Sequence, residues 1–85
     1  MFIVYSLYSK SFNKIYIGQT DDIERRLLEH NNGLLSTHTK RFKPWEVIYT
    51  EKYYTRSEAV IREKQLKSSR GRAFIWDMIK KEKFN

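Results

Sequence analysis

The chain has 85 residues, a length that suits one small domain spanning residues 1–85. It contains no cysteine, which excludes disulfide frameworks and thiolate zinc sites, and 17 basic against 10 acidic residues give a net charge of +7. This charge favours a polyanionic partner such as DNA, RNA or an anionic membrane, although solubility alone also explains a basic surface. No stretch approaches the roughly 20 apolar residues of a membrane span, and the N-terminus does not resemble a signal peptide. We therefore expect a cytoplasmic protein without a membrane partner.

Two short strands are expected at the N-terminus. Residues 2–8 are rich in β-branched and aromatic residues, which favour strands. Residues 9–13 are polar, and residues 14–19 alternate again, with Tyr16 and Gly18 on one face. Two alternating segments joined by a polar turn predict a β-hairpin.

A helix is expected next, over about residues 22–31. Asp21 followed by Glu24 has the spacing of a capping box, with Asp21 as the N-cap. Asn32-Gly33 is expected to end this helix, because glycine accepts the left-handed conformation that follows a helix terminus. Residues 34–44 are expected to form a loop.

The C-terminal half continues with a strand and two helices. Residues 45–54 are expected to form the strand, and Thr55 with Glu58 predicts a capping box that starts a helix ending near Lys67. A last helix is expected over about residues 72–81. Three side chains of the strand are expected on one face: Trp45, Val47 and Tyr49. The order β-β-α-β-α-α predicts an α+β fold, a small three-stranded antiparallel sheet with flanking helices.

Three polar side chains lie at positions that suggest contact with the protein interior. Arg26 and His30 are four residues apart and therefore project from the same side of the first helix. Glu63 falls within the apolar stripe of the second helix, where a carboxylate is costly unless it is paired or binds a metal. Two interpretations stay open for Glu63: an ion pair with Arg26 or Lys67 or a bond from a tyrosine hydroxyl, or a metal site.

The two tyrosines of the hairpin, Tyr5 and Tyr16, have an ordinary explanation, because tyrosine packs well in strands. Gly18 is less ordinary, because glycine weakens a strand and often marks a bulge or a close approach. The conjunction of these three residues with Arg26, His30 and Glu63 is what singles out this set.

The set resembles the GIY-YIG nuclease family. Ile3-Val4-Tyr5 corresponds to the first motif and Tyr16-Ile17-Gly18 to the second, with Arg26 at the position of the family's arginine. The likeness is greatest to short stand-alone bacterial members related to the N-terminal nuclease domain of the bacterial excision-repair nuclease (excinuclease). The first motif has Ile3 in place of glycine, and Gln19 stands where excision-repair relatives have a lysine.

The resemblance implies a metal-dependent DNA endonuclease that hydrolyses phosphodiester bonds. Glu63 would bind one divalent cation, Mg²⁺ or Mn²⁺, and Arg26 would hold the phosphate. Tyr16 would act as the base, and Tyr5 would form a hydrogen bond to it or to the attacking water. His30 would relay a proton or orient the phosphate. Nearby positive charge is expected to favour the phenolate form of the tyrosine.

The expected partner is DNA, duplex or branched. Six basic residues are expected to contact phosphates without reading sequence: Lys14, Lys40, Arg41, Lys67, Arg70 and Arg72. Repair and recombination are the roles that the resemblance suggests. Two alternatives stay open: a nucleic-acid-binding module that acts only with a larger protein partner, and a basic RNA-binding protein. The sequence leaves the oligomeric state and the cleavage specificity open.

Overall fold

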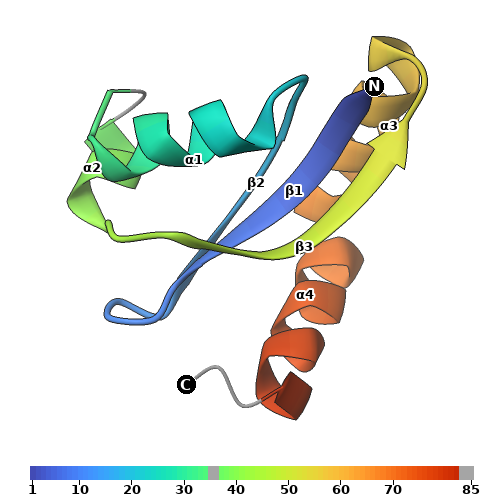
Figure 1. The fold of residues 1–85 in the computed structure, drawn as a ribbon. Helices are drawn as coiled ribbons and strands as arrows, with labels where there is room; N and C mark the ends of the chain where they lie inside the picture. Colours follow the sequence, from blue (N-terminus) through green and yellow to red (C-terminus); the bar gives the residue numbers. More distant parts are fainter. Residues whose placement is uncertain (35–36, 83–85) are drawn as a thin grey trace.

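The computed structural model describes residues 1–34 and 37–82. Within these ranges a three-stranded antiparallel sheet of order β2-β1-β3 is flanked by helices, which confirms the predicted α+β fold (Figure 1). The elements in chain order are β1 (Phe2–Ser9), β2 (Lys14–Thr20), α1 (Ile23–Asn31), α2 (Thr37–Arg41), β3 (Glu46–Tyr53), α3 (Arg56–Lys67) and α4 (Ser69–Glu82). The short helix α2 lies in the segment for which the sequence predicts only a loop.

The hairpin of β1 and β2 forms as predicted. The two strands pair in antiparallel register with Tyr5 opposite Gly18. The connecting turn contains Asn13 at φ 54°, a left-handed conformation that asparagine tolerates better than most residues. The hydroxyl of Tyr8 donates to Oδ1 of Asn13 at 3.2 Å, which ties the turn to the strand.

An irregularity in the pairing of β1 with β3 changes which face the residues of β3 occupy. Ser6 pairs with Tyr49, but the next residue, Leu7, pairs with Val47, so that Ile48 is skipped. Such a bulge breaks the alternation of side chains. Val47 and Trp45 therefore pack in one core cluster and Tyr49 in the other, and the prediction that all three share a face is wrong for Tyr49.

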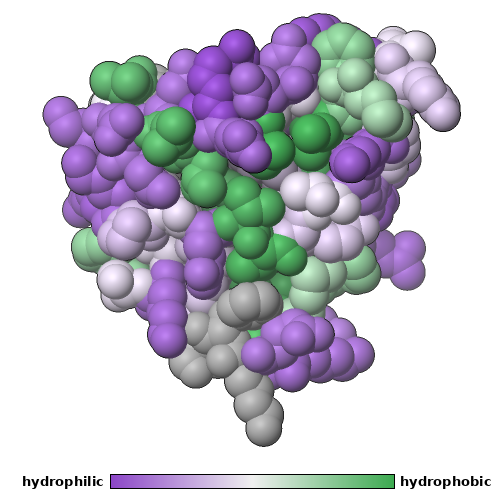
Figure 2. Space-filling view, in the orientation of Figure 1, coloured by the Kyte–Doolittle hydropathy of each residue, from purple (hydrophilic) through white to green (hydrophobic). Residues whose placement is uncertain are grey.

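The central strand β1 is buried on both faces. Val4 and Tyr8 belong to a core cluster with residues of α3 and α4, whereas Tyr5 and Leu7 belong to a second cluster that residues of α1 contact. Figure 1 shows α1 and α2 grouped apart from α3 and α4. Figure 2 shows a band of hydrophobic residues between hydrophilic ones on one face, as is usual where a domain has too little polar surface to cover its core.

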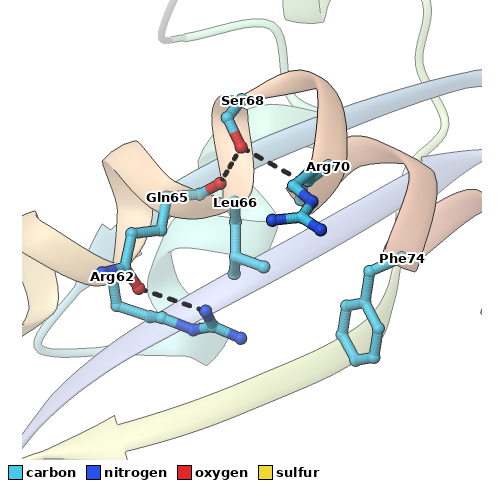
Figure 3. A pocket seen from close by; sticks show the side chains of 7 residues that line it. Arg62, Gln65, Leu66, Ser68, Arg70 and Phe74 are labelled. Carbon is cyan, nitrogen blue, oxygen red and sulfur yellow. Dashed lines mark hydrogen bonds between the residues drawn. The ribbon is translucent and has the colours of Figure 1, made fainter.

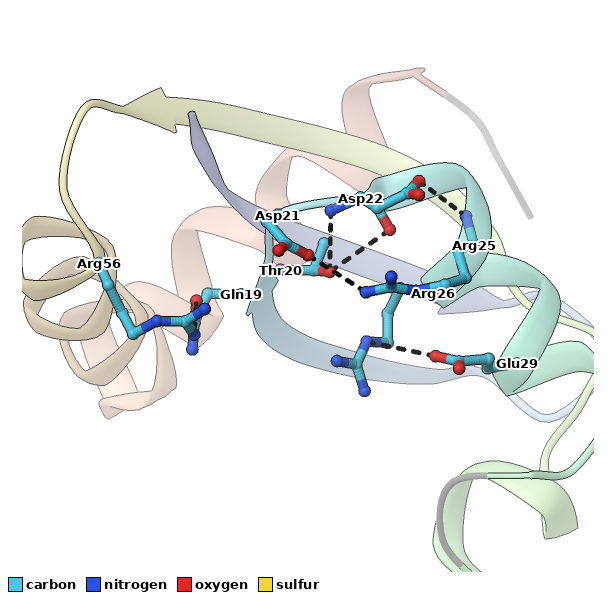
Figure 4. A network of polar contacts seen from close by, with 8 residues as sticks. All are labelled: Gln19, Thr20, Asp21, Asp22, Arg25, Arg26, Glu29 and Arg56. Atoms are coloured by element: carbon cyan, nitrogen blue, oxygen red, sulfur yellow. Dashed lines mark hydrogen bonds and ion pairs between the residues drawn. The ribbon is translucent and has the colours of Figure 1, made fainter.

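Helix α1 begins one residue later than the sequence suggested. Asp22, not Asp21, is the N-cap, because its Oδ1 accepts a hydrogen bond from the backbone N–H of Arg25 at 3.1 Å (Figure 4). Asp21 instead pairs with the guanidinium of Arg25 at 3.1 Å. Gly33, at φ +71°, ends the helix in the left-handed conformation, as predicted.

Helices α3 and α4 follow each other with almost no connection. The predicted capping box of Thr55 and Glu58 starts α3. At its other end, Oγ of Ser68 donates to the carbonyl of Gln65 at 2.5 Å and accepts from the N–H of Gly71 at 3.2 Å (Figure 3). Ser68 therefore caps both helices, and α4 begins three residues earlier than predicted.

A largely buried carboxylate joins β3 to α3. Both oxygens of Glu51 accept hydrogen bonds from the Arg62 guanidinium, at 2.8 and 3.0 Å, and the hydroxyls of Tyr49 and Tyr53 also donate to Glu51. Burial opposes the charge, but these donors outweigh it and lower the pKa of Glu51 to about 2. The helix that carries Glu63 is thus fixed against β3 of the sheet.

Residues 1–34 and 37–82 contain the four helices α1 to α4. None of the helices in these ranges has both the length and the apolar character needed to cross a bilayer.

Candidate active site

Three of the predicted site residues meet on the face of the sheet that α1 covers. Tyr5 comes from β1, Tyr16 from β2 and His30 from the last turn of α1. The hydroxyl of Tyr5 lies 3.1 Å from Nε2 of His30, and the rings of Tyr16 and His30 are 4.7 Å apart between centroids. Since the two tyrosine rings are also stacked at 6.3 Å, the three side chains form one cluster.

Gly18 makes room for this cluster. It lies opposite Tyr5 in the register, and a Cβ atom at Gly18 would lie 2.6 Å from the Tyr5 hydroxyl oxygen. Real Cβ atoms do not approach that closely, and Tyr5 is buried and cannot move aside at low cost. The glycine of the second motif is therefore explained by a protein side chain that crosses above it.

His30 is fully buried and electrically neutral at physiological pH. Burial, and then the positive charge of Arg26, lower the pKa of His30 to about 4, although Glu29 acts in the opposite direction. Nε2 can therefore accept the hydroxyl proton of Tyr5, with the ring proton on Nδ1. Nδ1 is buried and has no hydrogen-bond partner within the described part of the chain.

The environment of Tyr5 favours its neutral phenol. Burial, and next the neighbouring Tyr16, raise the pKa of Tyr5 well above its usual value, and Arg26 offsets this only in part. Tyr5 therefore stays protonated, with its hydroxyl within hydrogen-bond distance of Nε2 of His30. This leaves Tyr16, which is only partly buried, as the tyrosine with access to solvent.

Arg26 is placed as its spacing from His30 predicted. Its Nε is buried without a hydrogen-bond partner among the described residues, and the nearest carboxylate oxygen, from Glu29, lies at 3.6 Å (Figure 4). Arg25, by contrast, is exposed and paired with Asp21. The side chain as a whole is 32% exposed, so the accessible part of the guanidinium has donor capacity for an incoming anion.

Glu63 is in an ion pair in this structure. Its Oε2 lies 2.7 Å from Nζ of Lys67, which realises one of the partners that the sequence left open. The carboxylate is largely shielded, with 21% of the side chain exposed. Its negative charge contributes to raising the pKa of Tyr5, so Glu63 acts electrostatically on the tyrosine cluster although α3 packs mainly on the other core cluster.

The carboxylate of Glu63 suits a hard divalent cation that keeps most of its water ligands. No group of three histidine, cysteine or acidic residues gathers in residues 1–34 and 37–82. Mg²⁺ is commonly held by one or two carboxylates together with waters and phosphate oxygens, and the partly exposed carboxylate of Glu63 fits that arrangement. The ammonium of Lys67 contacts Oε2 of this carboxylate and would compete with a cation there.

A groove of about 420 Å³ runs along the edge strand β2 beside Tyr16. Three of the predicted DNA-contacting residues line it, one each from β2, α3 and α4: Lys14, Lys67 and Arg72. Because Lys67 also contacts Glu63, the carboxylate adjoins the same groove.

The other three predicted DNA contacts lie elsewhere. Arg70 lines a separate pocket of about 510 Å³ together with Arg62 and Phe74, where α3 meets α4 (Figure 3). Lys40 and Arg41 are on the short helix α2. Glu29 was not predicted as an acidic neighbour of Arg26, although their spacing of three residues within a helix indicates such a contact.

Comparison with known proteins identifies the family. The GIY-YIG catalytic domain matches residues 1–77. The chain belongs to the GIY-YIG family. This membership places it in a nuclease family and confirms the resemblance that the two motifs indicated.

Several short proteins are similar to this chain. A UPF0213 protein of Staphylococcus saprophyticus is 41% identical over 54 residues, 64% of this chain and 66% of that protein. A UPF0213 protein of Listeria welshimeri is 46% identical over 55 residues, 65% of this chain and 61% of that protein. The matched segments thus span slightly less than two thirds of these GIY-YIG relatives, and their names state no substrate or activity.

A solved structure shows the same fold. The solution NMR structure of a UPF0213 protein from Bacillus halodurans has a TM-score of 0.53 and 27% sequence identity, covering 92% of this chain and 85% of that chain. The GIY-YIG sheet with its flanking helices is therefore shared over almost the whole chain.

Proposed function

We propose that this protein is a metal-dependent endonuclease that hydrolyses phosphodiester bonds of DNA, in repair or recombination. The observation that carries the proposal is the cluster of Tyr5, Tyr16 and His30 at the edge of a groove lined by basic side chains. This groove offers a path for a nucleic-acid backbone past a tyrosine, with Glu63 next to it.

The proposed division of work follows from the contacts. Glu63 would hold one Mg²⁺ or Mn²⁺, which supplies charge stabilisation for the leaving oxygen when bound. Arg26, whose side chain is 32% exposed, would donate to the phosphate through the accessible part of its guanidinium. The Tyr5 hydroxyl would donate to His30 when the ring proton is on Nδ1, which leaves its oxygen lone pairs to orient the attacking water. Tyr16, the less buried tyrosine, would act as the phenolate and accept a proton from that water, becoming the neutral phenol.

Nicking of supercoiled plasmid tests this proposal. Wild type with Mg²⁺ or Mn²⁺ should nick, and EDTA should abolish nicking. Glu63→Gln should lose about 100-fold in rate or more, since a lost cation removes several kcal/mol of transition-state stabilisation. Tyr16→Phe should lose roughly 10²–10⁴-fold, the usual contribution of a general base.

Glu24→Gln is the matched control, because it removes an exposed carboxylate from α1 and should keep full activity. Nicking that persists in EDTA, or full activity in Glu63→Gln with a folded protein, would reject the assignment.

A second candidate function is a nucleic-acid-binding module that cleaves only when a larger protein partner is present. The observation that favours it is the ion pair of Lys67 with Glu63 at 2.7 Å, which places an ammonium where a cation would bind. In that case the isolated protein would bind DNA or RNA with the same affinity in Mg²⁺ and in EDTA, and it would not nick.

A further inference from the structure

An exposed aromatic ring lies at the tip of the β1–β2 hairpin. Phe12 is in the turn, and 49% of its surface is exposed. It belongs to neither of the core clusters found among the described residues, and its ring meets Phe42 edge-on at 5.5 Å. Packing in the core therefore does not explain this phenylalanine.

Two cations lie near the neighbouring ring of Phe42. Nζ of Lys14 lies 5.3 Å and Cζ of Arg41 lies 5.5 Å from the centroid of Phe42, the ring that supports Phe12. We call Phe12, Lys14, Arg41 and Phe42 the hairpin-tip patch. Phe12 is thus an exposed aromatic ring in contact with a second ring that carries two cations. Aromatic rings together with nearby cations are the combination with which proteins bind a nucleobase and its neighbouring phosphates.

The hairpin-tip patch is continuous with the groove at the candidate active site. Lys14 belongs to both, because it also lines the groove with Tyr16. Lys14 and Tyr16 are two residues apart on β2, so they project to the same face about 7 Å apart. A nucleic-acid strand that passes Tyr16 in the groove therefore reaches the hairpin-tip patch within a short length of its sugar–phosphate backbone.

We propose that Phe12 is a stacking platform for an unpaired base, and that the groove binds single-stranded segments of nucleic acid. The inference rests on the proposed function, in which this groove holds the substrate. An aromatic side chain accepts any base by stacking, at about 1–3 kcal/mol per base. Bases inside an intact duplex are stacked on each other and cannot cover Phe12, so the platform discriminates in favour of unpaired nucleotides.

Binding in EDTA tests the platform without relying on cleavage. Fluorescence anisotropy compares a labelled single-stranded oligonucleotide with the blunt duplex of the same sequence. Wild type should bind the single strand more tightly. Phe12→Ala should weaken single-strand binding about 5- to 100-fold and duplex binding less than about twofold.

Phe74→Ala is the matched control, since Phe74 is similarly exposed, at 45%, but lines the pocket between α3 and α4. It should change neither affinity. Phe12→Trp should retain the affinity for the single strand, and its added fluorescence should be quenched on binding. This aromatic variant tests stacking directly and does not depend on how Phe12→Ala folds.

The outcomes separate this inference from the proposed nuclease activity. Equal losses on both ligands in Phe12→Ala, no loss on either, or unquenched Phe12→Trp would overturn the platform even if the protein nicks plasmid. Preferential single-strand binding that depends on Phe12 would support the platform even if no nicking is found. Failure of wild type to bind either ligand would overturn the platform and the proposed substrate together.

Discussion

His30 shows at the scale of a single residue how burial sets chemistry. A histidine on the flank of a short helix is usually exposed, but this one is enclosed between Tyr5, Tyr16 and Arg26. Its imidazole is therefore held neutral, and its Nε2 lies 3.1 Å from the Tyr5 hydroxyl oxygen. The ring fixes the direction of the tyrosine hydroxyl, which sits directly above Gly18.

The free energy of unfolding should fall as the pH is lowered from 6.5 to about 4, because the pKa of His30 is about 4 in the folded protein and 6.5 when the group is free of its surroundings. The unfolded chain binds a proton there and the folded protein does not, so the loss reaches up to about 3 kcal/mol. Urea unfolding at a series of pH values measures it.

His30→Gln is expected to be less stable than wild type near neutral pH and to show a flatter pH dependence. The pKa of Glu51 is lowered from 4.5 to about 2, so Glu51 contributes a further loss of unfolding free energy only below about pH 4.5. Wild type and His30→Gln should therefore be compared above that pH. An unchanged slope in His30→Gln would show that other groups cause the dependence.

At the scale of secondary-structure elements, the junction of α3 and α4 determines the geometry of the groove beside β2. A Cβ atom at Gly71 would lie 2.3 Å from the carbonyl oxygen of Gln65 and 2.3 Å from Cα of Leu66. These are backbone atoms, so the two helices can meet this closely only with glycine at that position. Lys67 and Arg72 flank this contact, and its geometry therefore sets the spacing of two groove-lining cations.

Gly71→Ala should destabilise the protein by about 1–3 kcal/mol, because the new methyl group must push α4 away from α3. Helix propensity alone predicts the opposite sign, a gain of about 1 kcal/mol from replacing glycine within a helix. Urea unfolding distinguishes the two, with Ser69→Ala as the control at an exposed position of the same helix. A more stable Gly71→Ala would disprove the close contact.

At the scale of the whole molecule, part of the basic charge that gives the net +7 is concentrated along one groove. Lys14 is far from Lys67 and Arg72 in the sequence, yet the three line one groove along the edge strand β2. Cations concentrated along a groove attract a polyanion more specifically than the same charges spread over the surface. The hairpin-tip patch extends this line of charge past Tyr16.

The salt dependence of binding should report these contacts. In the double variant Lys14→Gln/Arg72→Gln, the slope of log affinity against log salt should shrink by about 1.4–1.8, since each lost phosphate contact removes about 0.7–0.9. Lys64→Gln/Lys80→Gln removes the same charge from positions outside the groove and should change the slope much less. Equal changes in both double variants would argue against a defined groove.

The local features of the fold could be predicted from the sequence. Alternating residues predicted the hairpin, the Thr55 and Glu58 pair predicted the start of α3, and Gly33 predicted the end of α1. These signals act through neighbours in the chain, so no knowledge of packing was needed. The N-cap was predicted at Asp21 instead of Asp22, because both aspartates satisfy the local pattern and only the backbone geometry chooses between them.

The sequence by itself determined which residues form the candidate site, since the two motifs and the spacing of Arg26 from His30 are local features. The tertiary structure alone decided their state. It paired Glu63 with Lys67, kept Tyr5 protonated by burial, and brought distant cations to one groove. The physical reason is that desolvation and charge interactions depend on distances between elements, and packing sets those distances.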